Sequence, residues 1–123
     1  CGADVVVTEG PFDWLTAVQW SLPAVALLGT HVSRSTERAL MRFCRVYLAL
    51  DADEAGRRAA ATLMSALGAR AIAVELPPGV HDLNDLGRSL AGAEAFQRCL
   101  EHATHRKETR WTTFDETAGR RAA

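Results

Sequence analysis

The sequence lacks several features that would assign it to a class of protein at once. It has no apolar run near the ~18 residues that a membrane-spanning helix needs, and no signal-peptide pattern opens it. Its three cysteines are widely separated and form no CxxC pair, which argues against a zinc site and fits a reducing cytoplasm. Lys107 is the only lysine and the net charge is −1, so the composition shows no broad basic field for nucleic acid. Methionine is absent from position 1, and we expect the chain to be a fragment of a longer protein.

What the sequence does contain is a regular alternation of strand-like and helix-like segments. The segments predicted as strands are 4–8, 24–28, 45–50 and 71–76, and those predicted as helices are 11–20, 35–43, 54–67, 82–90 and 93–104. The strand segments are almost continuously hydrophobic, so both faces of each should be buried. This pattern predicts a mostly parallel four-stranded sheet flanked by helices. We expect one domain over residues 1–104 and a C-terminal tail or linker over 105–123, where no periodicity is clear.

Acidic residues gather where the predicted strands end. Glu9 follows the first strand segment, Asp51 and Asp53 follow the third, and Asp82 and Asp85 follow the fourth. In an open α/β sheet, ligands bind outside the carboxyl ends of the strands. The positions of these acids therefore predict a functional site at that edge of the sheet.

Asp51 and Asp53 indicate what this site binds. They are two residues apart, so in an extended chain their carboxylates point to the same side. Two carboxylates held that close repel each other, and a divalent cation such as Mg²⁺ or Mn²⁺ relieves the repulsion. The alternative is that Asp53 and Glu54 only stabilise the N-terminus of the following helix. The convergence of several acids on one edge favours a metal site.

Three segments carry a resemblance to a known family. VVVTEGPFD (residues 5–13) resembles the first motif of Toprim domains, LALDADEAGRRAA (48–60) resembles the second, and HDLND (81–85) resembles the third acidic segment. The continuation AGRRAA after the second motif, and the LLGT turn at 27–30, are similar to those of bacterial DnaG-type and of phage or plasmid primases. The resemblance covers about residues 4–90.

The resemblance implies a Toprim-like, Rossmann-type α/β sandwich that uses Mg²⁺ or Mn²⁺ for nucleotidyl or phosphoryl transfer. It makes Glu9 the acid/base residue or a ligand close to the metal, and Asp51 and Asp53 a metal-coordinating pair. Asp82 and Asp85 fall in the third acidic segment as further metal-ligand candidates. Which of these two binds metal stays open, because the segment departs from the usual primase pattern.

Candidate substrate-binding residues surround these acids. They are Gly10, Asp13, Thr30, Gly56, Arg57 and Arg58. Gly10 would allow a tight turn after Glu9, and Gly56 would let the start of a helix pack close to the sheet or to a phosphate. Arg57 or Arg58 could hold a phosphate through two hydrogen bonds, but an ion pair on a solvated helix face explains these arginines equally well.

The function that the resemblance implies is RNA primer synthesis on single-stranded DNA. The substrates would be a DNA template and nucleoside triphosphates, with a replicative helicase as a possible partner. Only the Toprim part of a primase is present, without a zinc module or a basic template-holding subdomain. Two alternatives stay open: a Toprim nuclease, and a non-catalytic Toprim module that binds nucleic acid or a protein partner.

Overall fold

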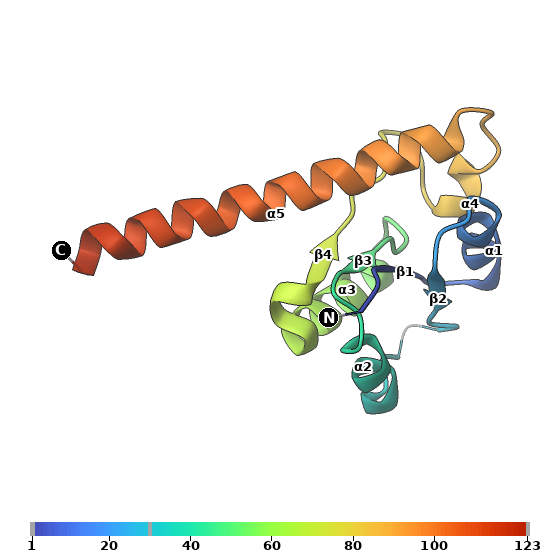
Figure 1. The fold of residues 1–123 in the computed structure, drawn as a ribbon. Coiled ribbons are helices and arrows are strands. Elements are labelled where there is room, and N and C mark those ends of the chain that lie inside the picture. The colour runs from blue at the N-terminus through green and yellow to red at the C-terminus, as the bar shows by residue number, and fades with distance from the viewer. Residues whose placement is uncertain (1, 30, 123) are drawn as a thin grey trace.

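The computed structural model describes residues 2–29 and 31–122, with side chains described as far as residue 109. Strands and helices alternate along the chain (Figure 1). The strands are β1 (Val5–Thr8), β2 (Ala24–Ala26), β3 (Val46–Leu48) and β4 (Ala71–Ala73), and the helices are α1 (Pro11–Gln19), α2 (Arg34–Leu40), α3 (Glu54–Leu67), α4 (Leu83–Leu86) and α5 (Gly92–Ala122). None of the helices in the described part of the chain has the length and apolar character to cross a membrane.

The four strands form one parallel sheet in the order β2-β1-β3-β4. This confirms the predicted fold class. The chain leaves β1 for β2 on one side and later returns to place β3 on the other side of β1. The connections therefore diverge between β1 and β3, and the crevice at such a divergence is where open α/β sheets bind their ligands.

Both faces of the sheet are buried, which explains the continuous hydrophobic character of the strands. Alternate residues point to opposite faces, so Val5 and Val7 pack with α2 and α3. Val6 between them packs with α1, α4 and α5. Leu63 of α3 belongs to the first of these layers and Phe96 of α5 to the second, and both side chains are fully buried.

The last helix is longer than the sequence predicts. The apolar periodicity ends near residue 104, whereas α5 continues to Ala122. Beyond the predicted end, the Lys107 ammonium donates hydrogen bonds to the carbonyl of Ala71 and, at 3.4 Å, to that of Gly68. Hydrogen bonds of Lys107 thus hold this part of α5, in place of the apolar contacts that give a helix its recognisable sequence period.

Candidate metal centre

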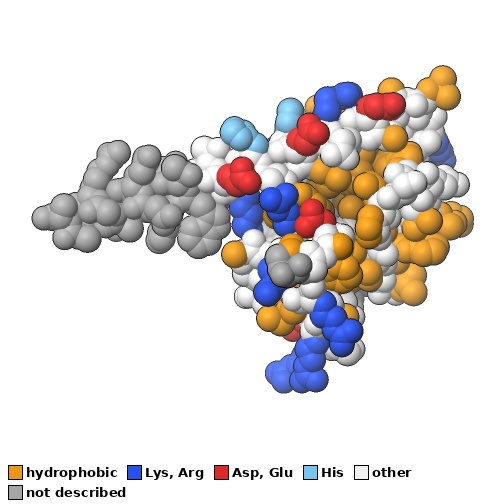
Figure 2. Space-filling view, in the orientation of Figure 1, with side chains coloured by type: hydrophobic (Ala, Val, Ile, Leu, Met, Phe, Trp, Pro, Cys, Tyr) orange, Lys and Arg blue, Asp and Glu red, His pale blue; other side chains and the backbone are white. Residues whose placement is uncertain are grey.

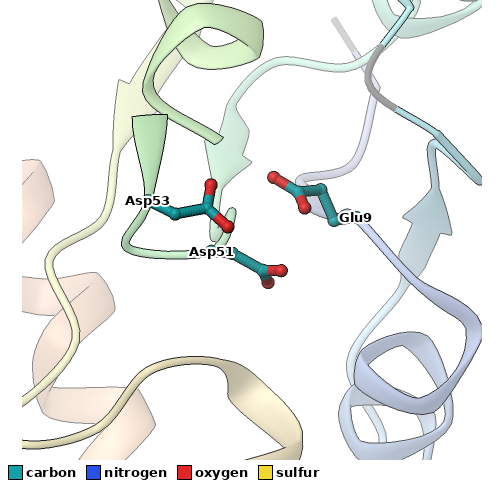
Figure 3. Close-up of side chains that lie close together, drawn as sticks. All are labelled: Glu9, Asp51 and Asp53. Carbon is teal, nitrogen blue, oxygen red and sulfur yellow. The ribbon is translucent and has the colours of Figure 1, made fainter. Parts of the chain in front are cut away.

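Three of the predicted acids come together at the carboxyl edge of the sheet. Glu9, Asp51 and Asp53 each contribute one carboxylate oxygen to a group in which all these atoms lie within 4.8 Å of one another. Figure 3 shows the three carboxylates converging from two sides, Glu9 from the end of β1 and the aspartates from the loop between β3 and α3. Among the described residues, no other three histidine, cysteine or acidic side chains meet in this way.

Pairing between β1 and β3 creates this juxtaposition. Val7 lies beside Leu48 in the register, and the Ala49 amide donates to the Val7 carbonyl at 2.9 Å. The chain then leaves both strands at the same level. The Glu9 carbonyl is fixed by the amide of Leu28 at 2.9 Å, so the backbone that carries this acid is held on both sides.

Asp53 has a structural function in this arrangement. It is the N-cap of α3, and its Oδ1 accepts the amide hydrogen of Gly56 at 2.7 Å. The capping role that the sequence offered as an alternative is therefore present. Capping does not exclude metal binding, because a carboxylate has a second oxygen and several lone pairs to offer.

Gly56 allows α3 to begin in direct contact with the acids. A Cβ atom at this position would lie 2.1 Å from the Asp51 carbonyl oxygen and 2.9 Å from Oε1 of Glu9. No side chain fits into that space without moving the backbone. The predicted close packing of Gly56 against the end of a sheet strand is thus present, and it shapes the space around the three acids.

The electrostatics of the cluster are unfavourable for three ionised carboxylates. Oε1 of Glu9 and Oδ1 of Asp51 are buried and have no hydrogen-bond donor among the described residues. Burial, the adjacent Glu9 carboxyl group and the charges of Asp82 and Asp53 together raise the pKa of Asp51 to about 7. Either a proton on Asp51 or a hard divalent cation relieves this repulsion. The residues present therefore fit Mg²⁺ or Mn²⁺.

Asp13 lies next to the three acids but has another partner. Its side chain is 6% exposed, and its Oδ1 accepts the backbone amide hydrogen of Asn84 at 2.8 Å. Burial raises the pKa of Asp13, the Asn84 amide lowers it, and the charges of Asp82 and Asp51 raise it again. No sequence pattern indicates the Asn84 contact, because a backbone amide makes it. Substrate binding by Asp13 stays a prediction.

Asp82 and Asp85 lie outside the group of three acids. Oδ1 of Asp82 caps α4 by accepting the amide hydrogen of Asp85 at 2.7 Å. Oδ2 of Asp85 accepts the amide hydrogen of His81 at 3.4 Å. Both acids thus organise the short segment around α4, and Asp82 is close enough to raise the pKa of Asp51. Metal binding by either one stays a prediction.

The remaining candidates differ in their surroundings. Arg58 forms an exposed ion pair with Glu54 at 2.6 Å, as the solvated-face alternative predicted. Arg57, by contrast, lines a hollow of about 430 Å³ together with Asp51 and Gly56. Thr30 lies outside the described residues.

Gly10 does not adopt the conformation that the sequence argument assumed. Its φ of −114° is open to any residue, and an added Cβ would meet no atom within 4 Å. The structure therefore gives no steric reason for glycine at this position.

Comparisons with known proteins agree with this geometry. A family model described as Toprim-like matches residues 6–87. No curated protein sequence matches the chain significantly. The primase fragment of the bacteriophage T7 primase-helicase protein matches 80% of this chain with a TM-score of 0.67 and 27% identity. The Aquifex aeolicus primase, solved as its zinc-binding and RNA polymerase domains, matches 82% with a TM-score of 0.69 and 26% identity.

A third structure holds T7 primase domains of two gp4 subunits, bound to an RNA/DNA hybrid and dTTP, with the T7 lagging-strand DNA polymerase. It matches 80% of this chain at 29% identity with a TM-score of 0.65. The matches cover 44%, 54% and 26% of the T7 fragment, the T7 complex chain and the Aquifex chain, respectively. The chain thus spans about half or less of the primases that it resembles.

Proposed function

The chain belongs to the Toprim-like family, and from this we propose that it is the metal-binding catalytic domain of a primase-like DNA replication protein. Its reaction would be nucleotidyl transfer, with single-stranded DNA as template and nucleoside triphosphates as substrates. Support for this proposal comes from the three solved structures compared above, which are primases or hold primase domains. The T7 relative is a primase-helicase protein, so a replicative helicase is the protein partner that we propose.

One observation carries the proposal: the two buried carboxylate oxygens of Glu9 and Asp51 that have no donor among the described residues. Groups of this kind are unfavourable unless they bind something positive. A bound Mg²⁺ would neutralise phosphate charge and activate the attacking hydroxyl group. Asp51 and Asp53 would hold the cation, and Glu9 would hold or return a proton beside it.

Arg57 completes the proposed site. It is exposed and lines the hollow next to Asp51, where a guanidinium can hold a phosphate oxygen through paired hydrogen bonds. Arg58 is engaged with Glu54 instead. We therefore assign phosphate orientation to Arg57 rather than to Arg58.

The test is a calorimetric titration of Mn²⁺ and Mg²⁺ into the wild-type chain and into the Asp51→Asn/Asp53→Asn variant. Asparagine is also a good N-cap, so the variant keeps the start of α3. We expect saturable binding by the wild type and none by the variant. Glu94→Gln/Glu101→Gln, which removes two exposed acids of α5, is the matched control and should bind metal normally.

Equal metal binding by the wild type and the double variant would contradict the proposed centre. Incubation of the metal-loaded chain with single-stranded DNA and nucleoside triphosphates then separates the reactions. A lengthened RNA product supports the primase assignment, and shortened DNA would assign the same centre to a nuclease. Metal binding without either product would favour a binding module.

A further inference from the structure

Helix α5 carries two neighbouring rows of polar side chains. Along one row, three residues recur at intervals of four, which we call the basic flank: Arg98, His102 and Arg106. About a quarter of a turn away, three acids recur at intervals of seven, which we call the acidic flank: Glu94, Glu101 and Glu108. Intervals of four and seven each keep residues on one side of a helix. Figure 2 shows acidic side chains spaced along the side of α5 that faces the viewer.

The two flanks face opposite edges of the sheet. Glu101 and Glu108 line a hollow of about 450 Å³ with residues that precede the strands, such as Asp4 and Arg45. The basic flank lines a different hollow, of about 340 Å³, with Glu75, Leu76 and Pro77, which follow β4. It therefore lies at the carboxyl edge of the sheet, the edge that also carries the three acids of the candidate metal centre.

The surface between the metal centre and the basic flank is continuous. The hollow beside Asp51 and Arg57 has Glu75 and Leu76 in its wall. The same two residues form part of the wall of the hollow under the basic flank. An extended ligand that leaves Asp51 can therefore cross Glu75 and Leu76 and reach the basic flank without passing around the molecule.

We propose that the basic flank binds successive phosphates of a single-stranded nucleic acid whose reacting end lies at the metal centre. The proposal rests on the proposed function, which places a phosphate ester at Asp51. Four residues of helix rise by about 6 Å, which is comparable to the spacing of phosphates along one strand. Arginine suits phosphate because its guanidinium donates paired, charge-assisted hydrogen bonds.

Three acids oppose this binding: Glu94 and Glu101, each one helical turn from Arg98, and Glu75, which follows β4. Glu75 is the one that pairs with Arg106. Its carboxylate lies 4.0 Å from the Arg106 guanidinium, and the Glu75 side chain is 81% exposed. An exposed ion pair of this length holds its partners weakly. Glu75 can therefore turn towards solvent when a phosphate approaches, which leaves Arg106 available to the strand.

The sequence does not reveal this surface through its charge totals. The net charge of −1 sums over all residues, so it shows neither flank. The two flanks are distinguished only by the helical spacing of residues 94–108 and by the packing of α5 against β4.

The test measures binding of fluorescein-labelled oligothymidine by fluorescence anisotropy, in EDTA and at low salt. The variant is Arg98→Ala/Arg106→Ala. The control is Arg34→Ala/Arg38→Ala, which removes the same charge from α2 on the opposite face of the sheet (Figure 1). We expect the α5 variant to bind about tenfold more weakly, with a salt slope reduced by about 1.4, because two phosphate contacts are lost. The control should change by less than about twofold, as only the long-range charge differs.

Three results would overturn the inference: no binding by the wild type, equal affinity in the α5 variant, or equal loss in the α2 control. Arg98→Lys/Arg106→Lys, which keeps the charge, should retain most of the affinity. The α5 variant should also bind Mn²⁺ like the wild type. If the wild type binds metal and the α5 variant binds oligothymidine as tightly as the wild type, only this inference is contradicted. If DNA binding depends on the basic flank but the wild type binds no metal, only the proposed function is contradicted.

Discussion

Gly56 lies in direct contact with two residues of the acidic cluster. Its missing side chain leaves the space in which α3 meets the Asp51 carbonyl and the Glu9 carboxylate. We expect Gly56→Ala to lower the free energy of unfolding by about 1–3 kcal/mol, because the new methyl group overpacks this contact. We also expect it to weaken Mn²⁺ binding at least about tenfold, since a displaced ligand costs over ~1.4 kcal/mol. Urea denaturation and calorimetry measure the two effects.

Gly10→Ala is the matched control for this substitution. An added methyl group at position 10 meets no atom within 4 Å, so metal binding should be unchanged and stability should fall by less than about 1 kcal/mol. Wild-type metal affinity in Gly56→Ala would show that the close contact has no part in forming the site.

The individual acids were predictable because the residues next to them in the sequence indicate where they lie in the fold. Asp51 and Asp53 follow a hydrophobic run directly, and Glu9 does the same after the first strand. Local sequence could not show that an oxygen of Asp53 caps α3, whereas one oxygen each of Glu9 and Asp51 has no hydrogen-bond donor among the described residues. That difference depends on the Gly56 amide and on the opposing strand, which only the folded chain brings into contact.

The contact between α1 and α4 positions the third acidic segment. It depends on Asp13, whose Oδ1 accepts the Asn84 amide hydrogen at 2.8 Å. We expect Asp13→Ala to lower the free energy of unfolding by about 1–2 kcal/mol, because a hydrogen-bond acceptor at a buried position is lost. Asp13→Asn keeps a carbonyl oxygen there and removes a charge that burial disfavours, so its stability should equal or exceed that of the wild type. Urea denaturation of both variants measures the difference.

An equal loss of stability in Asp13→Asn and Asp13→Ala would contradict this explanation. It would mean that the negative charge, and not the accepted hydrogen bond, holds α4 in place.

The extent of α5 shows why some elements cannot be predicted from sequence pattern. Strands and short helices bury apolar side chains, so their periodicity is visible. Past residue 104, α5 is held by Lys107, which donates to carbonyls at the end of α3 and in β4. A lysine in a polar segment looks like solvated surface, and its partners are backbone atoms of a distant part of the chain.

The stability of the whole metal-free domain should depend on pH through Asp51. Its pKa is raised from 3.8 to about 7, so the folded state binds this proton more tightly than the unfolded state. The contribution of the protonated group to stability is therefore complete below about pH 4 and is lost as pH rises to about 7. We expect Asp51→Asn to exceed the wild type by about 1–2 kcal/mol at pH 8 and to equal it near pH 4. This is less than the full pKa shift implies, because solvent screens a partly exposed group.

Urea denaturation in EDTA at a series of pH values measures this difference. Glu101→Gln, an exposed position of α5, is the control and should show no such pH-dependent gain. Added Mg²⁺ should stabilise the wild type at pH 8 and leave Asp51→Asn unchanged. A constant difference between Asp51→Asn and the wild type from pH 4 to pH 8 would contradict the assignment of the raised pKa to this carboxyl group.

The parallel sheet and the order of elements along the chain followed from the sequence, whereas the spatial order of the strands did not. Nothing in residues 5–8 or 46–48 states that these two strands are neighbours. The two strands become neighbours only when the helices pack on both faces of the sheet. It is this adjacency that converts three separate carboxylates into one candidate site.

The pairing of β1 with β3 also has a consequence for how the domain folds. Segments far apart in the chain pair slowly, because the loop between them must close before any contact repays the lost entropy. Glu9 and Asp51 meet only when that pairing is complete. The repulsion between them therefore destabilises the folded domain but does not oppose the early stages of its folding. Synthesis of the chain therefore does not bring these carboxylates together early, and the cation proposed to relieve their repulsion would act on a structure already assembled.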